Sequence, residues 1–150
     1  MKKSIYKIKD SVDLFLSDNL LLTAYFINSR RRKNFRINEE MIHLLEQIDG
    51  KRDVNQICDI MLNQYSVSKE SVNAAISMLL QNKIITEICD LSGIIDDLDY
   101  QRFTRQINYF SEFLGSEEDG VKAQKKIMQS HVGVFGCGAV GGNIAIQLAM

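Results

Sequence analysis

A glycine-rich segment near the carboxyl end constrains the fold more than any other part of the sequence. Gly136, Gly138 and Gly141 form a G-x-G-x-x-G pattern between the apolar run 132–135 and the helix-forming run 143–149. In such patterns the first glycine allows a tight turn, the second admits a phosphate, and the third lets a helix pack on the preceding strand. The segment therefore predicts the first strand, turn and helix of a nucleotide-binding domain.

The glycines alone leave the nucleotide open among NAD, FAD and ATP. The acidic residue that would hold a ribose lies about 20 residues past the glycines, which is beyond Met150. A tight turn without a ligand is one alternative. A membrane helix over residues 132–150 is another, but five glycines, Asn143 and Gln147 make that segment a poor span. We expect no membrane association.

Composition is that of an ordinary globular protein. The 150 residues suffice for one domain or two small ones, with 45% apolar and 25% charged residues. A net charge of −1 gives no general attraction to nucleic acid or anionic lipid. No export signal opens the chain, which predicts a cytoplasmic protein. The three cysteines are widely spaced and predict neither a disulfide framework nor a zinc site.

Residues 1–90 are predicted to form a separate α+β domain of winged-helix-like layout. Strands are expected over residues 11–16, 20–27, about 32–37, and 84–88. Three helices are expected between them, with Asn38, Asp53 and Ser68 as N-caps. Asp53 and Gln56 make a capping box, and Gly50 is expected to end the first helix. Residues 91–150 would comprise an acidic linker near 90–99, helices, and the incomplete start of the nucleotide-binding domain.

A winged-helix layout raises the possibility of DNA binding. Residues 30–33 and Arg36 form a basic cluster. The helix over residues 68–81, however, has a nearly neutral outer face without arginine, whereas phosphate contacts dominate DNA affinity. We expect no nucleic-acid partner.

Residues 11–88 resemble the PqqD-like RiPP recognition element, the leader-peptide-binding domain of enzymes that modify ribosomal peptides. The resemblance implies that a leader or precursor peptide adds a strand to the exposed edge near residues 32–37, beside the helix over 68–81. The implied peptide-binding residues are Arg32, Lys33, Asn34, Phe35, Arg36, Asn73 and Ser77. A basic edge would suit an acidic leader. A purely structural N-terminal cap is the alternative.

Residues 100–150 resemble the opening of ThiF/MoeB/HesA-type, E1-like adenylating enzymes. The features that carry the resemblance are Arg105-Gln106 in an expected short helix, the helix around 120–127, and the glycine loop. The family activates a carboxylate with ATP, forming an acyl-adenylate and pyrophosphate. An NAD dehydrogenase has no reason to carry the Arg105-Gln106 pair.

The resemblance also implies roles for individual residues. Gly136, Gly138, Ala139 and Gly141 would lie against the nucleotide, and Arg105 would reach the ATP phosphates from the other subunit of a homodimer. Arginine suits this role because its planar guanidinium stays charged. Ala139 and Gly142 depart from the glycine and the serine or threonine common in the family. The ligands for Mg²⁺, the catalytic lysine and any zinc cysteines would lie beyond Met150.

The remaining polar candidates are expected to be structural. His43 lies in an amphipathic helix and His131 at a strand entrance, where neither is a good base or ligand. The acidic groups 96–99 and 117–119 are expected in loops, as solvated residues rather than metal ligands. No metal site is predicted within these residues.

The sequence therefore supports three functional hypotheses. The first is ATP-dependent adenylation of a peptide or small-protein carboxylate in ribosomal peptide biosynthesis, with leader capture by residues 1–90. The second is a non-catalytic docking protein that presents the peptide to a separate modifying enzyme. The third is an NAD or FAD Rossmann enzyme.

Overall fold

Alternating side chains build a three-stranded antiparallel sheet early in the chain. The computed structural model describes residues 4–149, and this sheet has the order β2 (Val12–Ser17), β3 (Leu21–Phe26), β4 (Arg31–Arg36). Every second side chain of β3 is buried, which fixes the register because a one-residue slip would expose them all. The three predicted strands are confirmed, with each end shifted by one residue.

Three helices follow, and their predicted N-caps are confirmed. The helices are α1 (Glu39–Gln47), α2 (Val54–Tyr65) and α3 (Lys69–Gln81). Asn38 Oδ1 accepts a hydrogen bond from the Met41 amide at 3.1 Å. Asp53 and Gln56 each accept from the other's backbone N–H at 2.9 Å, which completes the capping box. Ser68 Oγ likewise accepts from the Ser71 amide.

A second antiparallel sheet joins distant parts of the chain, in the order β5 (Asp49–Asp53), β1 (Ile5–Ile8), β6 (Ile85–Glu87). The strand predicted over residues 84–88 is therefore present, but its partners are strands that the sequence did not indicate. The prediction that Gly50 ends the first helix is wrong. That helix stops at Gln47, and Gly50, with φ of +77°, lies inside β5. Pairing with β1 supplies the backbone hydrogen bonds that a continued helix would otherwise provide.

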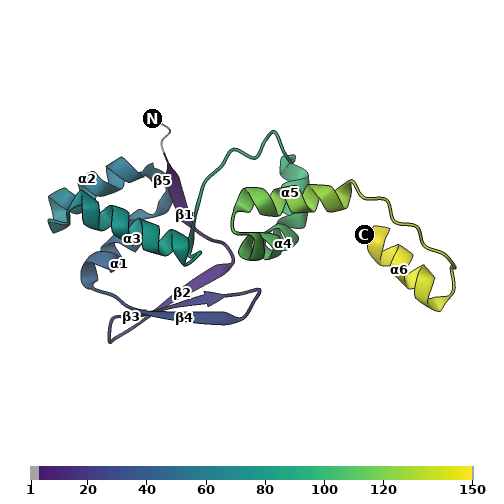
Figure 1. Ribbon diagram of the computed structural model, residues 1–150, viewed down its shortest axis with the longest axis horizontal. Helices are drawn as coiled ribbons and strands as arrows, with labels where there is room; N and C mark the ends of the chain where they lie inside the picture. The colour runs from purple at the N-terminus through teal and green to yellow at the C-terminus, as the bar shows by residue number, and fades with distance from the viewer. Residues whose placement is uncertain (1–3, 150) are drawn as a thin grey trace.

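One hydrophobic core unites both sheets with α1, α2 and α3 (Figure 1). Its fully buried members include Ala24, Ile57, Leu79 and Ile84, which come from a strand of the first sheet, two helices and the approach to β6. The α+β class expected for this part of the chain is confirmed.

A helical hairpin, α4 (Asp97–Leu114) and α5 (Glu117–Met128), packs beside this core around Ile95, Ile107 and Val121. The prediction that the two acidic groups lie in loops is wrong. Asp96 caps α4, with Asp97 and Asp99 in its first turn, and residues 117–119 form the first turn of α5. Carboxylates at these positions stabilise the positive end of the helix dipole. The Arg105-Gln106 pair accordingly lies in an 18-residue helix and not in a short one.

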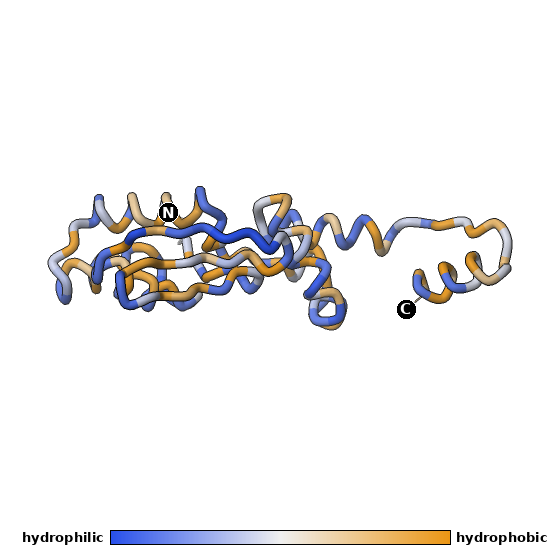
Figure 2. Tube along the Cα trace, turned by 90° about the horizontal axis from the view of Figure 1, so that it is seen from below, coloured by the Kyte–Doolittle hydropathy of each residue, from blue (hydrophilic) through white to orange (hydrophobic). Residues whose placement is uncertain are grey.

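Residues 129–149 form an arm that extends away from the rest of the chain (Figures 1 and 2). The strand predicted over residues 132–135 is wrong, since this segment is irregular and the Phe135 side chain is 100% exposed. A strand needs a neighbour for its backbone groups, and no described strand lies alongside it. The predicted helix is present as α6 (Ala139–Ala149), with no buried residue. Within residues 4–149, no helix is both long and apolar enough to cross a membrane.

Gly120 provides a test of the packing within the helical hairpin. A Cβ atom at this position would lie 2.0 Å from Ser111 Oγ and 2.6 Å from the Ile107 carbonyl oxygen. Gly120→Ala should therefore lower the free energy of unfolding by about 1–3 kcal/mol, despite the better helix propensity of alanine. Gly93→Ala is the control, because its Cβ would meet nothing within 4 Å. Equal urea midpoints for the two variants would contradict this packing.

Candidate functional site

The outer edge of β4 carries backbone N–H and C=O groups that pair with no other described strand. In an antiparallel pair, successive residues direct their N–H and C=O groups alternately toward and away from the partner strand. The Ile37 N–H donates to the Leu20 carbonyl at 3.0 Å, and Ile37 and Leu20 continue the β3–β4 register. By alternation, Arg32, Asn34 and Arg36 direct their backbone groups away from β3. No other described strand pairs with that edge.

A groove runs between this edge and α3. It has a volume of about 630 Å³ and is lined by residues 34–38 together with Met41 and Met78. A smaller pocket of about 140 Å³ adjoins it, sharing Asn38 and Met41. That pocket lies between the helices and its lining is largely apolar: Leu44, Met61, Val67, Val72 and Ala75. The edge strand thus lies beside a surface that can accept apolar side chains.

The predicted peptide-binding residues of β4 divide between the two faces of the sheet. Asn34 accepts a hydrogen bond from the Thr23 hydroxyl at 3.0 Å, and the Arg32 guanidinium lies over the Tyr25 ring. Arg36 belongs to the same alternating set as these two. Lys33 and Phe35 face the other way, where Lys33 contacts the end of α3 and Phe35 packs against the core.

Asn73 and Ser77 are on the exposed surface of α3 and do not line the groove. The α3 residues that do line it are Ser71, Val72, Ala75 and Met78. The 3.6-residue period of the helix was the available signal for this set, which includes the buried Val72. Met41 of α1 lies on the apolar side of its helix with Leu44 and Ile48, but its place in the groove depends on how α1 packs.

Polar contacts join the N-terminal domain to the helical hairpin. The buried Glu112 carboxylate accepts hydrogen bonds from the Asn28 and Ser29 amides at 3.2 and 2.9 Å. These two residues form the turn between β3 and β4, so α4 holds the turn that precedes the open edge strand. Lys9 Nζ, itself buried, donates to the Gly115 carbonyl at 2.8 Å.

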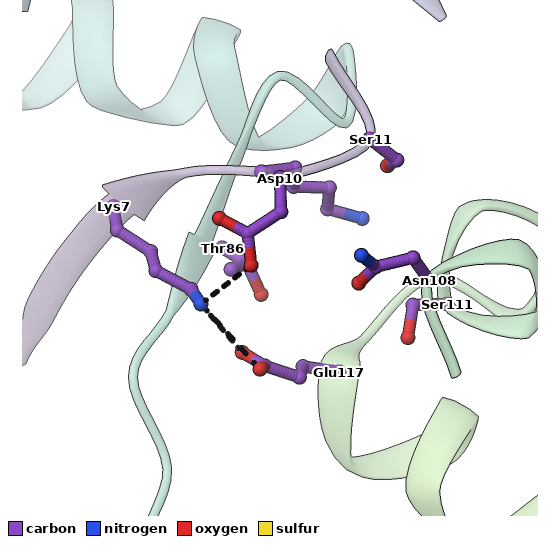
Figure 3. A pocket seen from close by; sticks show the side chains of 8 residues that line it. Lys7, Asp10, Ser11, Thr86, Asn108, Ser111 and Glu117 are labelled. Atoms are coloured by element: carbon purple, nitrogen blue, oxygen red, sulfur yellow. Dashed lines mark hydrogen bonds and ion pairs between the residues drawn. The ribbon is translucent and has the colours of Figure 1, made fainter. Parts of the chain in front are cut away.

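Lysine and carboxylate side chains meet in a second part of this junction (Figure 3). Lys7 Nζ lies 3.2 Å from Asp10 and 3.4 Å from Glu117. Burial disfavours the Lys7 charge, but Glu117 and Asp10 outweigh it and raise the lysine pKa. The Tyr100 hydroxyl also donates to Glu117, and burial together with this carboxylate raises the tyrosine pKa. These charged and polar side chains pair with one another, so this contact is a structural junction.

Two glycines of the loop occupy positions that disfavour a side chain. Gly136 adopts a φ of +95°, which favours glycine. A Cβ on Gly141 would lie 1.9 Å from the Gly136 carbonyl oxygen, so α6 approaches its own turn closely. A Cβ on Gly138 would meet nothing within 4 Å. Its lack of a side chain is therefore not required by the surrounding fold.

The remaining site residues lie apart from one another. Arg105 is exposed on α4, and Ala139 begins α6 in the arm. Figures 1 and 2 place α6 away from α4, so this chain does not bring Arg105 to its own glycine loop. His43 stacks on Tyr65 and contacts Glu46 on the surface. Within residues 4–149, no three histidine, cysteine or acidic side chains gather as a metal site would require.

Comparisons with known proteins identify similarity at the level of the fold. No family model matches the sequence, and no curated protein matches it. Among solved structures, a heterocyclase in complex with substrate and cofactor matches with a TM-score of 0.54 and 10% identity over 78% of this chain. The heterocyclase TruD matches with a TM-score of 0.54 and 14% identity over 76% of this chain. The chain corresponds to only 13% and 14% of those two proteins.

Glu112 provides a test of the junction that supports β4. Glu112→Ala should lower the free energy of unfolding by about 2–4 kcal/mol, because two amides lose a charged acceptor in a buried place. Glu112→Gln should cost roughly half as much, since one acceptor oxygen remains. Glu118→Ala is the control on the same hairpin. Its partner is Lys122 in an exposed ion pair, so it should change stability by less than about 1 kcal/mol. Equal effects of Glu112→Ala and Glu118→Ala would contradict the assigned contacts.

Proposed function

We propose that residues 4–90 capture a precursor peptide in ribosomal peptide modification, by adding the peptide as a strand along β4. The observation that carries this proposal is the open backbone edge of Arg32, Asn34 and Arg36 beside the groove lined by Met41 and Met78. Edge pairing would supply affinity without regard to sequence, and the apolar pocket would select side chains. The peptide would lie between β4 and α3.

The charge on the edge strand supports an acidic peptide. Three of the six residues of β4 are arginines, and among residues 4–149 none of them takes part in an ion pair. An acidic ligand would supply the missing countercharge. The fold similarity to heterocyclases, one of them solved with its substrate, supports placing the domain in an enzyme that modifies peptides.

We further propose that the second part of the chain begins an ATP-dependent adenylating domain. The left-handed Gly136, the close approach of Gly141 and the open space at Gly138 suit a loop against which a nucleotide phosphate lies. ATP would activate the peptide carboxylate. Arg105, with its fixed charge and planar donors, would stabilise phosphate charge from a second subunit. Mg²⁺ would be held by residues outside this segment.

A docking protein without catalysis is the second candidate. It is favoured by the arm, in which the nucleotide-binding strand is absent and α6 buries no residue. In that case the chain would present its peptide to a separate modifying enzyme. Peptide capture is common to both candidates, and nucleotide chemistry separates them.

Proline substitution at the edge tests peptide capture. Asn34→Pro removes an N–H that faces away from β3, so the β3–β4 ladder should survive while an added strand loses a donor. For peptides of about a dozen residues, selected from a random library on the wild-type chain, affinity should fall about tenfold or more. Leu16→Pro is the control, because its N–H faces the other open edge of the same sheet. Equal affinity for the two variants would contradict strand addition along β4.

Pyrophosphate exchange tests the adenylation step. In the full-length gene product, Arg105→Ala should lower ATP–pyrophosphate exchange by about 100-fold or more, with peptide affinity unchanged. Arg105→Lys should recover only part of the rate, because lysine retains the charge but not the planar fork. Absence of exchange in the folded wild-type protein would exclude the enzyme and leave the docking role.

A further inference from the structure

We propose that an acidic side chain of the captured peptide enters a second pocket, built jointly by the N-terminal domain and α4. This inference rests on the proposed peptide capture and adds a specificity site to it. The pocket has a volume of about 300 Å³ and lies at the other end of β4 from the groove beside Met41 and Met78. Its lining residues are Phe26, Ser29, Arg31, Lys33, Asn82, Lys83, Glu112 and Phe113.

The pocket carries an excess of positive charge. Arg31, Lys33 and Lys83 line it, against the single carboxylate of Glu112. That carboxylate is buried and is already used by two backbone amides of the β3–β4 turn. An incoming carboxylate would therefore meet cations without displacing an existing ion pair.

The two lysines currently donate to neutral groups. Lys33 Nζ lies 3.3 Å from the Asn82 carbonyl oxygen and 3.1 Å from its side-chain oxygen. Lys83 Nζ lies 3.4 Å from the carbonyl oxygen of Phe113 in α4. An ammonium group has three donors, so each lysine retains at least one for a ligand. A carboxylate is a stronger acceptor for these donors than a carbonyl group.

Lys83 occupies a position that favours glycine. The Ile84 amide donates to Leu79, and the Lys83 amide donates to Leu80, which closes α3 with a Schellman motif. Lys83 is the left-handed residue of this motif, with φ of +61°. Glycine would adopt this conformation with less strain. The backbone at this position therefore does not require a lysine, and the side chain contributes a charge to the pocket and a hydrogen bond to the Phe113 carbonyl of α4.

The geometry of β4 sets the spacing of the peptide motif. Residues 31, 33, 35 and 37 alternate along the strand and lie on one face of the sheet. Arg31 and Lys33 line the acidic-side-chain pocket. Phe35 and Ile37 line the groove beside Met41 and Met78, together with Asn34 and Arg36 at the strand edge. From Lys33 to Ile37 is four residues, roughly 13 Å along a strand. Because side chains of an added strand alternate, an acidic and a large apolar residue separated by an even number of positions, about four, would fill both sites.

Selection of peptides on the complete 150-residue chain tests the motif. Random peptides of about a dozen residues should be enriched in sequences with a glutamate or aspartate about four positions from a large apolar residue. In the tightest selected peptide, changing that acid to its amide should weaken binding about tenfold, as measured by fluorescence anisotropy. The loss should shrink at high salt, because the interaction is ionic.

Two substitutions to glycine test whether the preference for the acidic peptide arises in this pocket. Lys83→Gly preserves the left-handed backbone and removes one of the three cations that line the pocket, so the tenfold preference for the acidic peptide over its amide should fall sharply. Arg30→Gly is the matched control. Arg30 is also left-handed, with φ of +56°, and it does not line the pocket. Its substitution therefore removes one nearby positive charge without changing the pocket lining. It should leave the preference intact. Thermal unfolding of both variants shows whether the fold is retained.

The outcomes separate this inference from the proposed function. If no peptide is enriched on the wild-type chain, peptide capture itself fails. If peptides bind along β4 but the acid and its amide bind equally, the pocket proposal fails and capture stands. If Lys83→Gly and Arg30→Gly reduce the preference equally, the effect is general charge attraction, and the pocket proposal fails.

Discussion

The alternation of hydrogen bonds in the β3–β4 ladder is the constraint on which the proposed peptide site depends. Because β4 gives the backbone groups of every second residue to β3, the remaining groups face an open edge. An exposed edge of this kind favours aggregation unless it is charged or covered. The three arginines of β4 supply charge, and a bound peptide would cover the edge. The arginines would thus oppose pairing between free edges and attract the proposed acidic peptide.

The helix α4 connects the proposed capture site with the proposed chemistry. Through Glu112 it holds the turn before β4, and through Phe113 it closes the acidic-side-chain pocket. The same helix carries Arg105 on its exposed surface. The junction is made of buried polar contacts, which are costly to leave unsatisfied and therefore fix the geometry between the two parts. Arg105 and two residues that line this pocket, Glu112 and Phe113, therefore lie on the same helix.

Short-range sequence signals predicted where the helices begin. They did not predict which strands pair across long distances in the chain. The caps at Asn38, Asp53 and Ser68 act within three residues, so the helix starts were predictable. Strands β1 and β5 depend on partners far along the chain, and Asp49–Asp53 has no alternating apolar pattern. The β4 edge was predictable from its polar sequence. The period of each helix indicated which side of it is apolar, but not that Met41 and Met78 would line one groove, because that depends on how α1 and α3 pack.

Hydrogen exchange at individual amides of β4 tests the central claim most directly. In the free chain the amides of Arg32, Asn34 and Arg36 should exchange rapidly, whereas those of Lys33 and Phe35, which face β3, should be protected. Adding a peptide selected on the wild-type chain should protect the first set and leave the second unchanged. Tight binding with no new protection at Arg32, Asn34 and Arg36 would contradict strand addition along this edge.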